Sequence, residues 1–148
     1  MKDNRIRIPM IVAIVLQSIA ALIGFLCYFM QGLLRPNVSI SVKVFPINLV
    51  YILLILIFQV IIVLTMQTYE GESRRGVGII LTIVYCLCSV LMPYISIVAN
   101  VFASREGVEY VAAQSTLGSS VSLFTSPFST VATALTLIAI GRYGISKE

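Results

Sequence analysis

The stretch of residues 119–141, in the C-terminal third of the chain, reads SSVSLFTSPFSTVATALTLIAIG. It carries no charge, and hydroxyl side chains recur along it at steps of three and four. Because an α-helix turns once every 3.6 residues, these hydroxyls share one face, with bulky apolar side chains opposite. Such a face is typical of helix contacts inside a membrane, where small residues allow close approach. The hydroxyl stripe consists of Ser122, Ser126, Ser129, Thr133 and Thr136.

The composition of the whole chain indicates that lipid surrounds this stretch. Of the 148 residues, 59% are hydrophobic and 11% are charged, whereas soluble domains are about 45–50% apolar and about 25% charged. The charges cluster between four uncharged segments, each long enough to cross a hydrocarbon core of about 30 Å as a helix. The sequence therefore predicts an all-α integral membrane protein, one four-helix transmembrane domain. The expected spans are residues 8–34, 45–67, 77–102 and 119–141.

The distribution of lysine and arginine predicts the orientation. Seven of these ten residues lie in the terminal segments or between the second and third spans, and three lie in the other two connections. The positive-inside rule then places both termini in the cytoplasm, and we expect a multi-pass protein of the plasma membrane. In the 103–118 connection, between the third and fourth spans, we expect a short interfacial helix. Residues 38–44 alternate apolar and polar side chains, which indicates a strand that either pairs with another chain or lies extended at the headgroups.

Two further spans carry seams of small or polar residues that match the hydroxyl stripe. The second span lacks such a seam, and Gln59 is the one polar side chain near its middle. We therefore expect the first, third and fourth spans to form the centre of the bundle and the second span to lie outermost. The matching seams comprise Gln17, Ala20 and Gly24 in the first span and Ser89 and Ser96 in the third.

The polar residues present no arrangement suited to catalysis. The chain has no histidine, and every charged residue falls outside the predicted spans. A serine nucleophile needs a base within hydrogen-bond reach, and a metal ion needs converging imidazole, thiolate or carboxylate groups. The positive charges are divided among the membrane flanks instead of forming a patch for nucleic acid. We expect no enzymatic activity, no metal or cofactor, and no nucleic-acid partner.

Two functional interpretations of the stripe stay open. In the first, the stripe packs against the small seams, and the protein is an accessory, regulatory or scaffold subunit. Its partners would be the lipid bilayer and either a second copy or a larger membrane protein. In the second, the stripe and Gln17 line a cavity of a small transporter or channel subunit for a neutral or weakly polar solute. Kinks at Pro93 and Pro127, which lack a backbone N–H, would then mark a gate.

Overall fold

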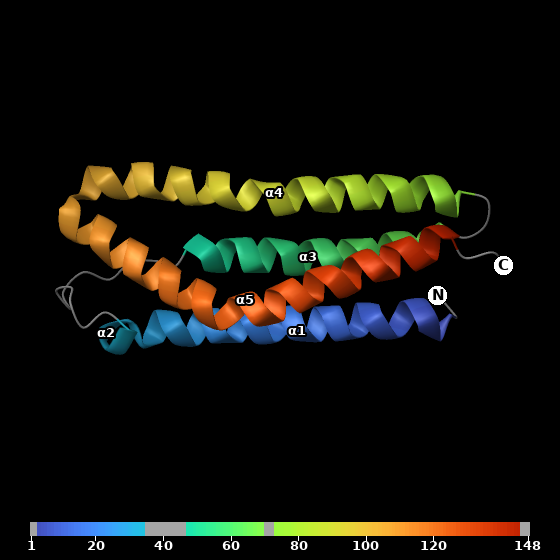
Figure 1. The fold of residues 1–148 in the computed structure, drawn as a ribbon, viewed down its shortest axis with the longest axis horizontal. Helices are drawn as coiled ribbons and strands as arrows, with labels where there is room; N and C mark the ends of the chain where they lie inside the picture. The colour runs from blue at the N-terminus through green and yellow to red at the C-terminus, as the bar shows by residue number, and fades with distance from the viewer. Residues whose placement is uncertain (1–2, 35–46, 70–72, 146–148) are drawn as a thin grey trace.

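Every element that the structure describes is a helix. The structure is a computed structural model, and it describes residues 3–34, 47–69 and 73–145. Four helices are long and apolar enough to cross a membrane, which confirms the predicted all-helical class. The strand expected at residues 38–44 lies outside the described residues. The helices are α1 (Asn4–Phe29), the short α2 (Gln31–Leu34), α3 (Ile47–Thr68), α4 (Arg74–Glu106) and α5 (Val108–Ile145), shown in Figure 1.

The long helices run alternately in opposite directions, so that the start of α1, the end of α3, the start of α4 and the end of α5 lie together at one end, the terminal end (Figure 1). Hydrogen bonds join the helices at this terminal end. Arg142 donates from Nη1 to the carbonyl of Arg5 at 2.9 Å, and the hydroxyl of Tyr143 donates to the carbonyl of Tyr69. The side chain of Asp3 accepts from the backbone N–H of Arg5 and caps α1.

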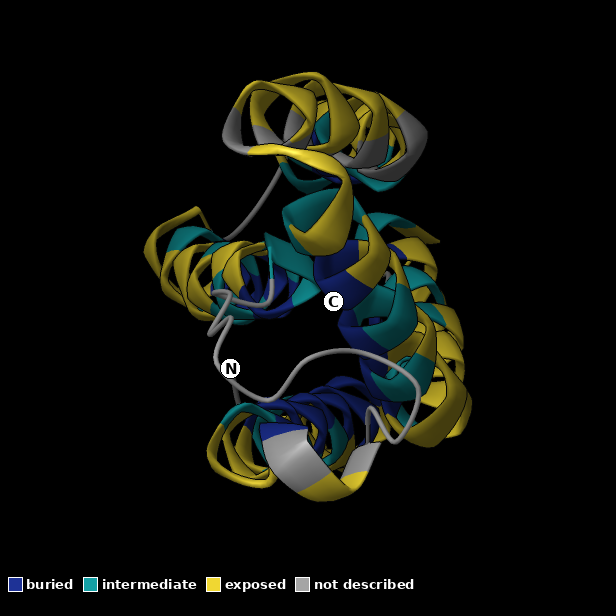
Figure 2. Ribbon diagram, turned by 90° about the vertical axis from the view of Figure 1, so that its left-hand side faces the viewer, coloured by how far each residue is buried: buried dark blue, intermediate teal, exposed yellow. Residues whose placement is uncertain are grey.

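Helix α5 is the central element, because it contacts all the other helices. Helices α1 and α4 lie on opposite sides of the bundle (Figure 2), and they make no contact with each other within the described ranges. The expectation that the second span lies outermost, and that the first and third join the fourth in the centre, is therefore wrong. Over the most apolar 18 residues of each helix, 17% of the residues of α4 are buried, compared with 33% of those of α3. Helix α4 is therefore the outermost helix.

The buried face of α3 explains this difference. Its members recur at steps of three and four, as a helix face requires, although most are bulky aliphatic side chains. Such side chains fill the space between helices as well as small ones do, so a helix without small residues need not lie at the edge. The face consists of Leu49, Ile52, Ile55, Gln59, Ile62 and Met66.

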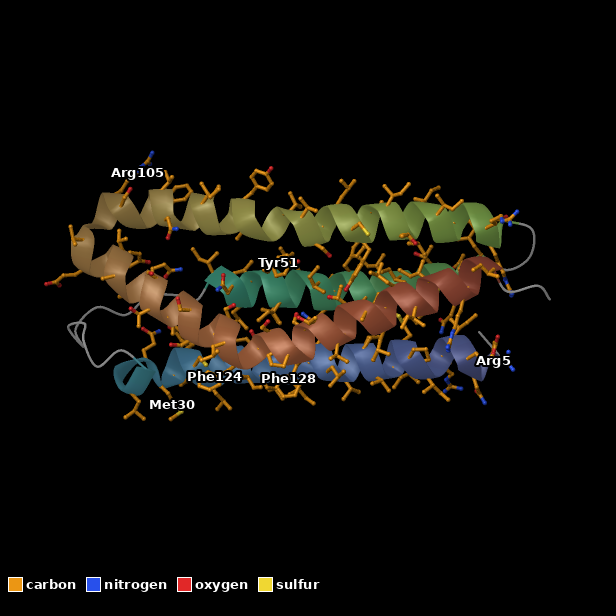
Figure 3. All side chains as sticks on the ribbon, in the orientation of Figure 1. Arg5, Met30, Tyr51, Arg105, Phe124 and Phe128 are labelled. Atoms are coloured by element: carbon orange, nitrogen blue, oxygen red, sulfur yellow. The ribbon has the colours of Figure 1, made fainter. Side chains whose placement is uncertain are left out.

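The chain reverses between α4 and α5 at a single residue, Gly107, whose φ of 111° favours glycine. The separate interfacial helix expected in the 103–118 connection is absent, because α5 is one helix of 38 residues. In the first half of α5 the hydroxyls of Thr116 and Ser120 donate to carbonyls four residues earlier, which satisfies these hydroxyls within the helix. Helix α5 bends in its middle (Figure 1), and Figure 3 places Phe124 and Phe128 at the bend, on either side of Pro127. Proline lacks the N–H that would continue the hydrogen-bond ladder there.

Candidate functional site

The half of the hydroxyl stripe nearer the C-terminus forms buried hydrogen bonds inside the bundle. Gln59 on α3 donates from Nε2 to Thr136 Oγ1 at 3.1 Å, and Thr136 in turn donates to the carbonyl of Ala132. The hydroxyl of Tyr85 on α4 lies 3.4 Å from Thr133 Oγ1 and donates to it. Thr133 and Thr136 therefore belong to the packed interior, where they join α5 to α3 and α4.

A second set of buried bonds joins α1, α3 and α5. Gln17 is fully buried, donates from Nε2 to the carbonyl of Ile52 at 3.1 Å, and accepts at Oε1 from the hydroxyl of Ser129 at 3.2 Å. Ala20 and Gly24 are buried on the same face of α1. Gln17, Ser129, Ala20 and Gly24 are thus all packing residues, and Gln17 does not line the groove described next.

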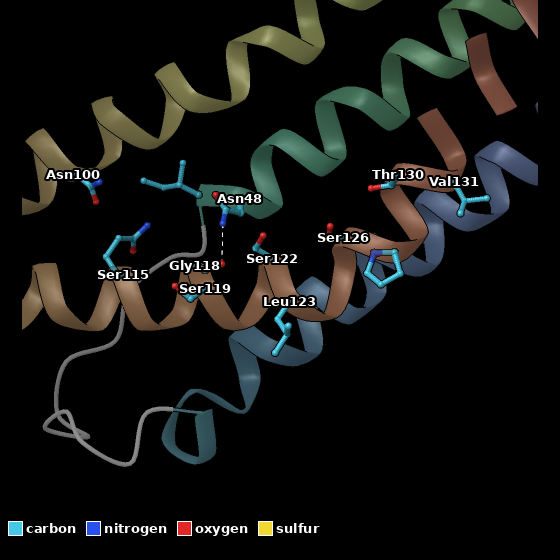
Figure 4. A pocket seen from close by; sticks show the side chains of 13 residues that line it. Asn48, Asn100, Ser115, Gly118, Ser119, Ser122, Leu123, Ser126, Thr130 and Val131 are labelled. Carbon is cyan, nitrogen blue, oxygen red and sulfur yellow. Dashed lines mark hydrogen bonds between the residues drawn. The ribbon is translucent and has the colours of Figure 1, made fainter. Parts of the chain in front are cut away.

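The other half of the stripe is exposed and lines a groove of about 1080 Å³ (Figure 4). The groove runs along α5 and is walled by the first turn of α3 and the C-terminal part of α4. The described residues of its lining carry no charge. Three amide side chains contribute, namely Asn48, Asn100 and Gln114, and the exposed hydroxyls are those of Ser115, Ser119, Ser122, Ser126 and Thr130.

Most polar groups of the groove have no hydrogen-bond partner among the described residues. None of the five exposed hydroxyls forms a hydrogen bond with another described residue, whereas the hydroxyl of Thr125, buried on the same helix, donates to the carbonyl of Val121 at 2.6 Å. Gln114 is only 6% exposed, yet its Oε1 has no partner within the described part of the chain. Asn48 is the exception, because its Nδ2 donates to the carbonyl of Gly118 at 3.0 Å and holds α3 against α5 (Figure 4).

A smaller cavity of about 360 Å³ extends the groove toward the middle of the bundle. The two share Asn48, Ser122, Ser126 and Thr130 in their linings. The cavity is also lined by Tyr51 and Ser89, and the hydroxyl of Tyr51 donates to the carbonyl of Ser89 at 3.5 Å. Nearer the terminal end lies an apolar cluster that includes Ile62, Leu81 and Ile140. The polar path is therefore closed on that side.

Comparison with protein-family models, curated proteins and solved structures finds no match. The chemistry of the groove is then set by what its residues provide, which is a row of uncharged donors and acceptors. Among the described residues no three His, Cys, Asp or Glu side chains lie close enough to hold a metal ion. Cys27 is buried and Cys86 is exposed, in separate parts of the bundle.

The residues singled out in the sequence thus fall into two groups in the structure, those that line the groove and those that pack inside the bundle. Ser122 and Ser126 line the groove, and the other described members of the seams pack inside the bundle, with Ser89, Ser129 and Thr133 also lining the inner cavity. The side chains of Ser96 and Pro93 lie outside the described residues. On the face opposite the stripe, Phe124 is exposed, whereas Phe128 is half-buried against the cluster around Ala20.

The sequence interpretation missed the part of the groove nearest the α4–α5 reversal, including Gln114, Ser115 and Ser119. The signal was present, because Ser115, Ser119 and Ser122 continue the stripe backward at steps of four and three. Because most of residues 114–120 are small and polar, their sequence is typical of a connection between helices. The helix continues through them, and Asn48 on α3 holds this part of α5 by donating to the carbonyl of Gly118.

Proposed function

We propose that the chain is a non-catalytic, multi-pass membrane protein that holds a partner membrane protein by packing one of the partner's transmembrane helices into the groove of α5. It would serve as an accessory, regulatory or scaffold subunit. The outward faces of the bundle support insertion into lipid, because bulky apolar side chains cover them at every level, as Leu22, Ile57 and Leu87 illustrate.

In this proposal the membrane is the plasma membrane, and both termini of the chain lie in the cytoplasm. The support is the charge at the two ends of the bundle. Among the described residues, Arg105 is at the end that carries the α4–α5 reversal, whereas Arg5 marks the terminal end (Figure 3). An excess of positive charge on one side is typical of the cytoplasmic face. The described arginines of the terminal end are Arg5, Arg7, Arg74, Arg75 and Arg142.

The exposed hydroxyl row is the observation that carries the proposal. Hydrocarbon offers no hydrogen bonds, so a bundle surrounded only by lipid is more stable with Ser122 and Ser126 turned inward. Membrane helices use small hydroxylated side chains where a neighbouring helix approaches closely. The row is therefore a helix-contact surface that this chain leaves uncovered.

Affinity purification in mild detergent, followed by native mass spectrometry, tests the proposal. Ser126→Phe fills the groove, and Leu22→Phe adds a similar bulk to the outward face of α1. We expect the wild-type chain and Leu22→Phe to retain one co-purifying membrane protein and Ser126→Phe to lose it. A strict monomer in all three cases, or a partner that Ser126→Phe retains, contradicts the proposal.

The inner cavity favours a second candidate, a small transporter or channel subunit for a neutral or weakly polar solute. The groove and cavity give a polar path from the α4–α5 end to about the level of Thr133. Since the apolar cluster closes the path, passage requires the helices to move. Glycerol uptake into proteoliposomes, measured by light scattering, separates the two candidates: uptake that Ser126→Phe abolishes favours transport, and uptake equal to that of empty liposomes rejects it.

A further inference from the structure

The chemistry of the groove specifies what fills it. We propose that the occupant is a single uncharged transmembrane helix of another membrane protein, with small residues along the contact and a side-chain N–H or O–H donor at the level of Gln114. This inference rests on the proposed function and adds the recognition chemistry of the same groove.

The need for a donor follows from Gln114. Its side chain is more than nine-tenths buried in the wall of the groove, and Oε1 has no partner among the described residues. A buried acceptor left unpaired costs free energy. Because Oε1 itself has almost no accessible surface, the carboxamide of Gln114 must turn toward the groove, where a donor on the incoming helix then pairs it. The donor is neutral, because no carboxylate lies in the described lining and an unpaired cation within a membrane is costly.

The need for a helix follows from the length of the hydroxyl row. The row runs from Ser115 to Thr130, which is about 22 Å along α5. A helix segment of that length and about 10 Å in diameter has a volume of about 1,700 Å³, so the groove of about 1080 Å³ takes roughly three-fifths of it. A lipid headgroup stays at the interface, and its acyl chains offer nothing to the deeper hydroxyls of Ser126 and Thr130. A small solute leaves most of the groove to water, which is unfavourable along a surface that lipid touches.

A second copy of the chain fits the groove less well than a different protein does. The hydroxyl row is recessed between α3 and α4, so the α5 helices of two copies do not reach each other. At this level the described outward residues of α1 and α3 are bulky and apolar, as are Leu26 and Leu54, and provide no donor. On α4, Tyr94 is exposed and carries a hydroxyl, so self-association through α4 is the competing outcome.

Synthetic transmembrane peptides test the inference on the full-length protein in phosphatidylcholine vesicles. Each probe is a leucine–alanine helix with a Gly-xxx-Gly contact. Two probes carry one asparagine near either end, to cover both orientations, and the matched control carries leucine there. Affinity is measured by fluorescence transfer. We expect one asparagine probe to bind wild-type protein about 3- to 20-fold more tightly than the control, as interhelical hydrogen bonds in membranes allow.

The near-isosteric variant Gln114→Leu should lose this preference and bind the control probe as wild type does, which also shows that it is folded. The outward variant Leu22→Ala should keep the preference. A preference that survives Gln114→Leu, equal binding of all probes, displacement by an unlabelled second copy of the chain, or competition by glycerol or glycolipid each overturns the inference. If the probes are not distinguished while Ser126→Phe still loses its cellular partner, the proposed function stands and this inference alone fails.

Discussion

Replacing Gly78 by alanine tests a close backbone contact between α4 and α5. A Cβ atom at this position on α4 would lie 3.0 Å from the Cα and 3.4 Å from the backbone nitrogen of Gly144 on α5, and 3.6 Å from the carbonyl oxygen of Ile140. These are backbone atoms, so no side-chain rotation relieves the contact. The two helices must separate.

The size of the effect follows from two opposing contributions. Overpacking a close contact costs about 1–3 kcal/mol, whereas replacing glycine by alanine within a helix gains up to about 1 kcal/mol. Gly76, on the same helix, is exposed and has nothing within 4 Å of an added Cβ, so Gly76→Ala receives the gain without the penalty. The free energy of unfolding should therefore be lower for Gly78→Ala than for Gly76→Ala by about 1–3 kcal/mol.

A matched control comes from the other side of the same contact. A Cβ on Gly144 would lie 3.7 Å from Gly78 Cα, an ordinary van der Waals distance, so Gly144→Ala should resemble Gly76→Ala. Reversible unfolding in mixed detergent and dodecyl sulfate, followed by circular dichroism, measures all three variants. If Gly78→Ala lies within about 0.5 kcal/mol of Gly76→Ala, the spread of ordinary surface substitutions, the close crossing of α4 and α5 is refuted.

Three further predictions concern the buried amides, the groove and the orientation. Gln17→Leu should lower the free energy of unfolding by about 1 kcal/mol, because it removes two interhelical hydrogen bonds. Gln59→Leu should cost less, since it loses one bond but also removes an unpaired buried oxygen; the opposite order in the same unfolding assay contradicts both assignments. In a variant whose native cysteines are replaced, Ser122→Cys in the purified protein should react with a membrane-impermeant thiol reagent and Thr125→Cys should not, and equal labelling rules out an open groove. A fluorescent-protein fusion at either terminus should fluoresce and a secreted alkaline phosphatase fusion should be inactive, whereas active phosphatase at both termini reverses the proposed orientation.

The existence of the four long helices was predictable from the sequence, while their lateral arrangement was not. Uncharged segments of this length satisfy their backbone hydrogen bonds only as helices when they lie in hydrocarbon, so composition alone predicts the elements. Which helices touch depends on how side-chain volumes fit together. Gln59 shows the difficulty: as one polar residue in an aliphatic helix it suggested an edge position, yet it is fully buried and bonded to Thr136.

The hydroxyl stripe shows the same division between what a pattern predicts and what packing decides. Ser129, Thr133 and Thr136 form hydrogen bonds to neighbouring helices. The spacing of the stripe does not reveal that Ser122 and Ser126 lie beyond the bend at Pro127 and face a groove instead. A bend changes which neighbour a face meets without changing the periodicity of the sequence.

A photo-crosslinking scan in native membranes tests our claim that a helix of another membrane protein covers the groove of α5. Benzoylphenylalanine is placed in turn at Ser115, Ser119, Ser122 and Ser126, with Leu22 on α1 as the outward control. We predict adducts with one and the same partner protein at the groove positions and none at Leu22. No protein adduct at any groove position, or the same adducts at Leu22, would contradict the claim.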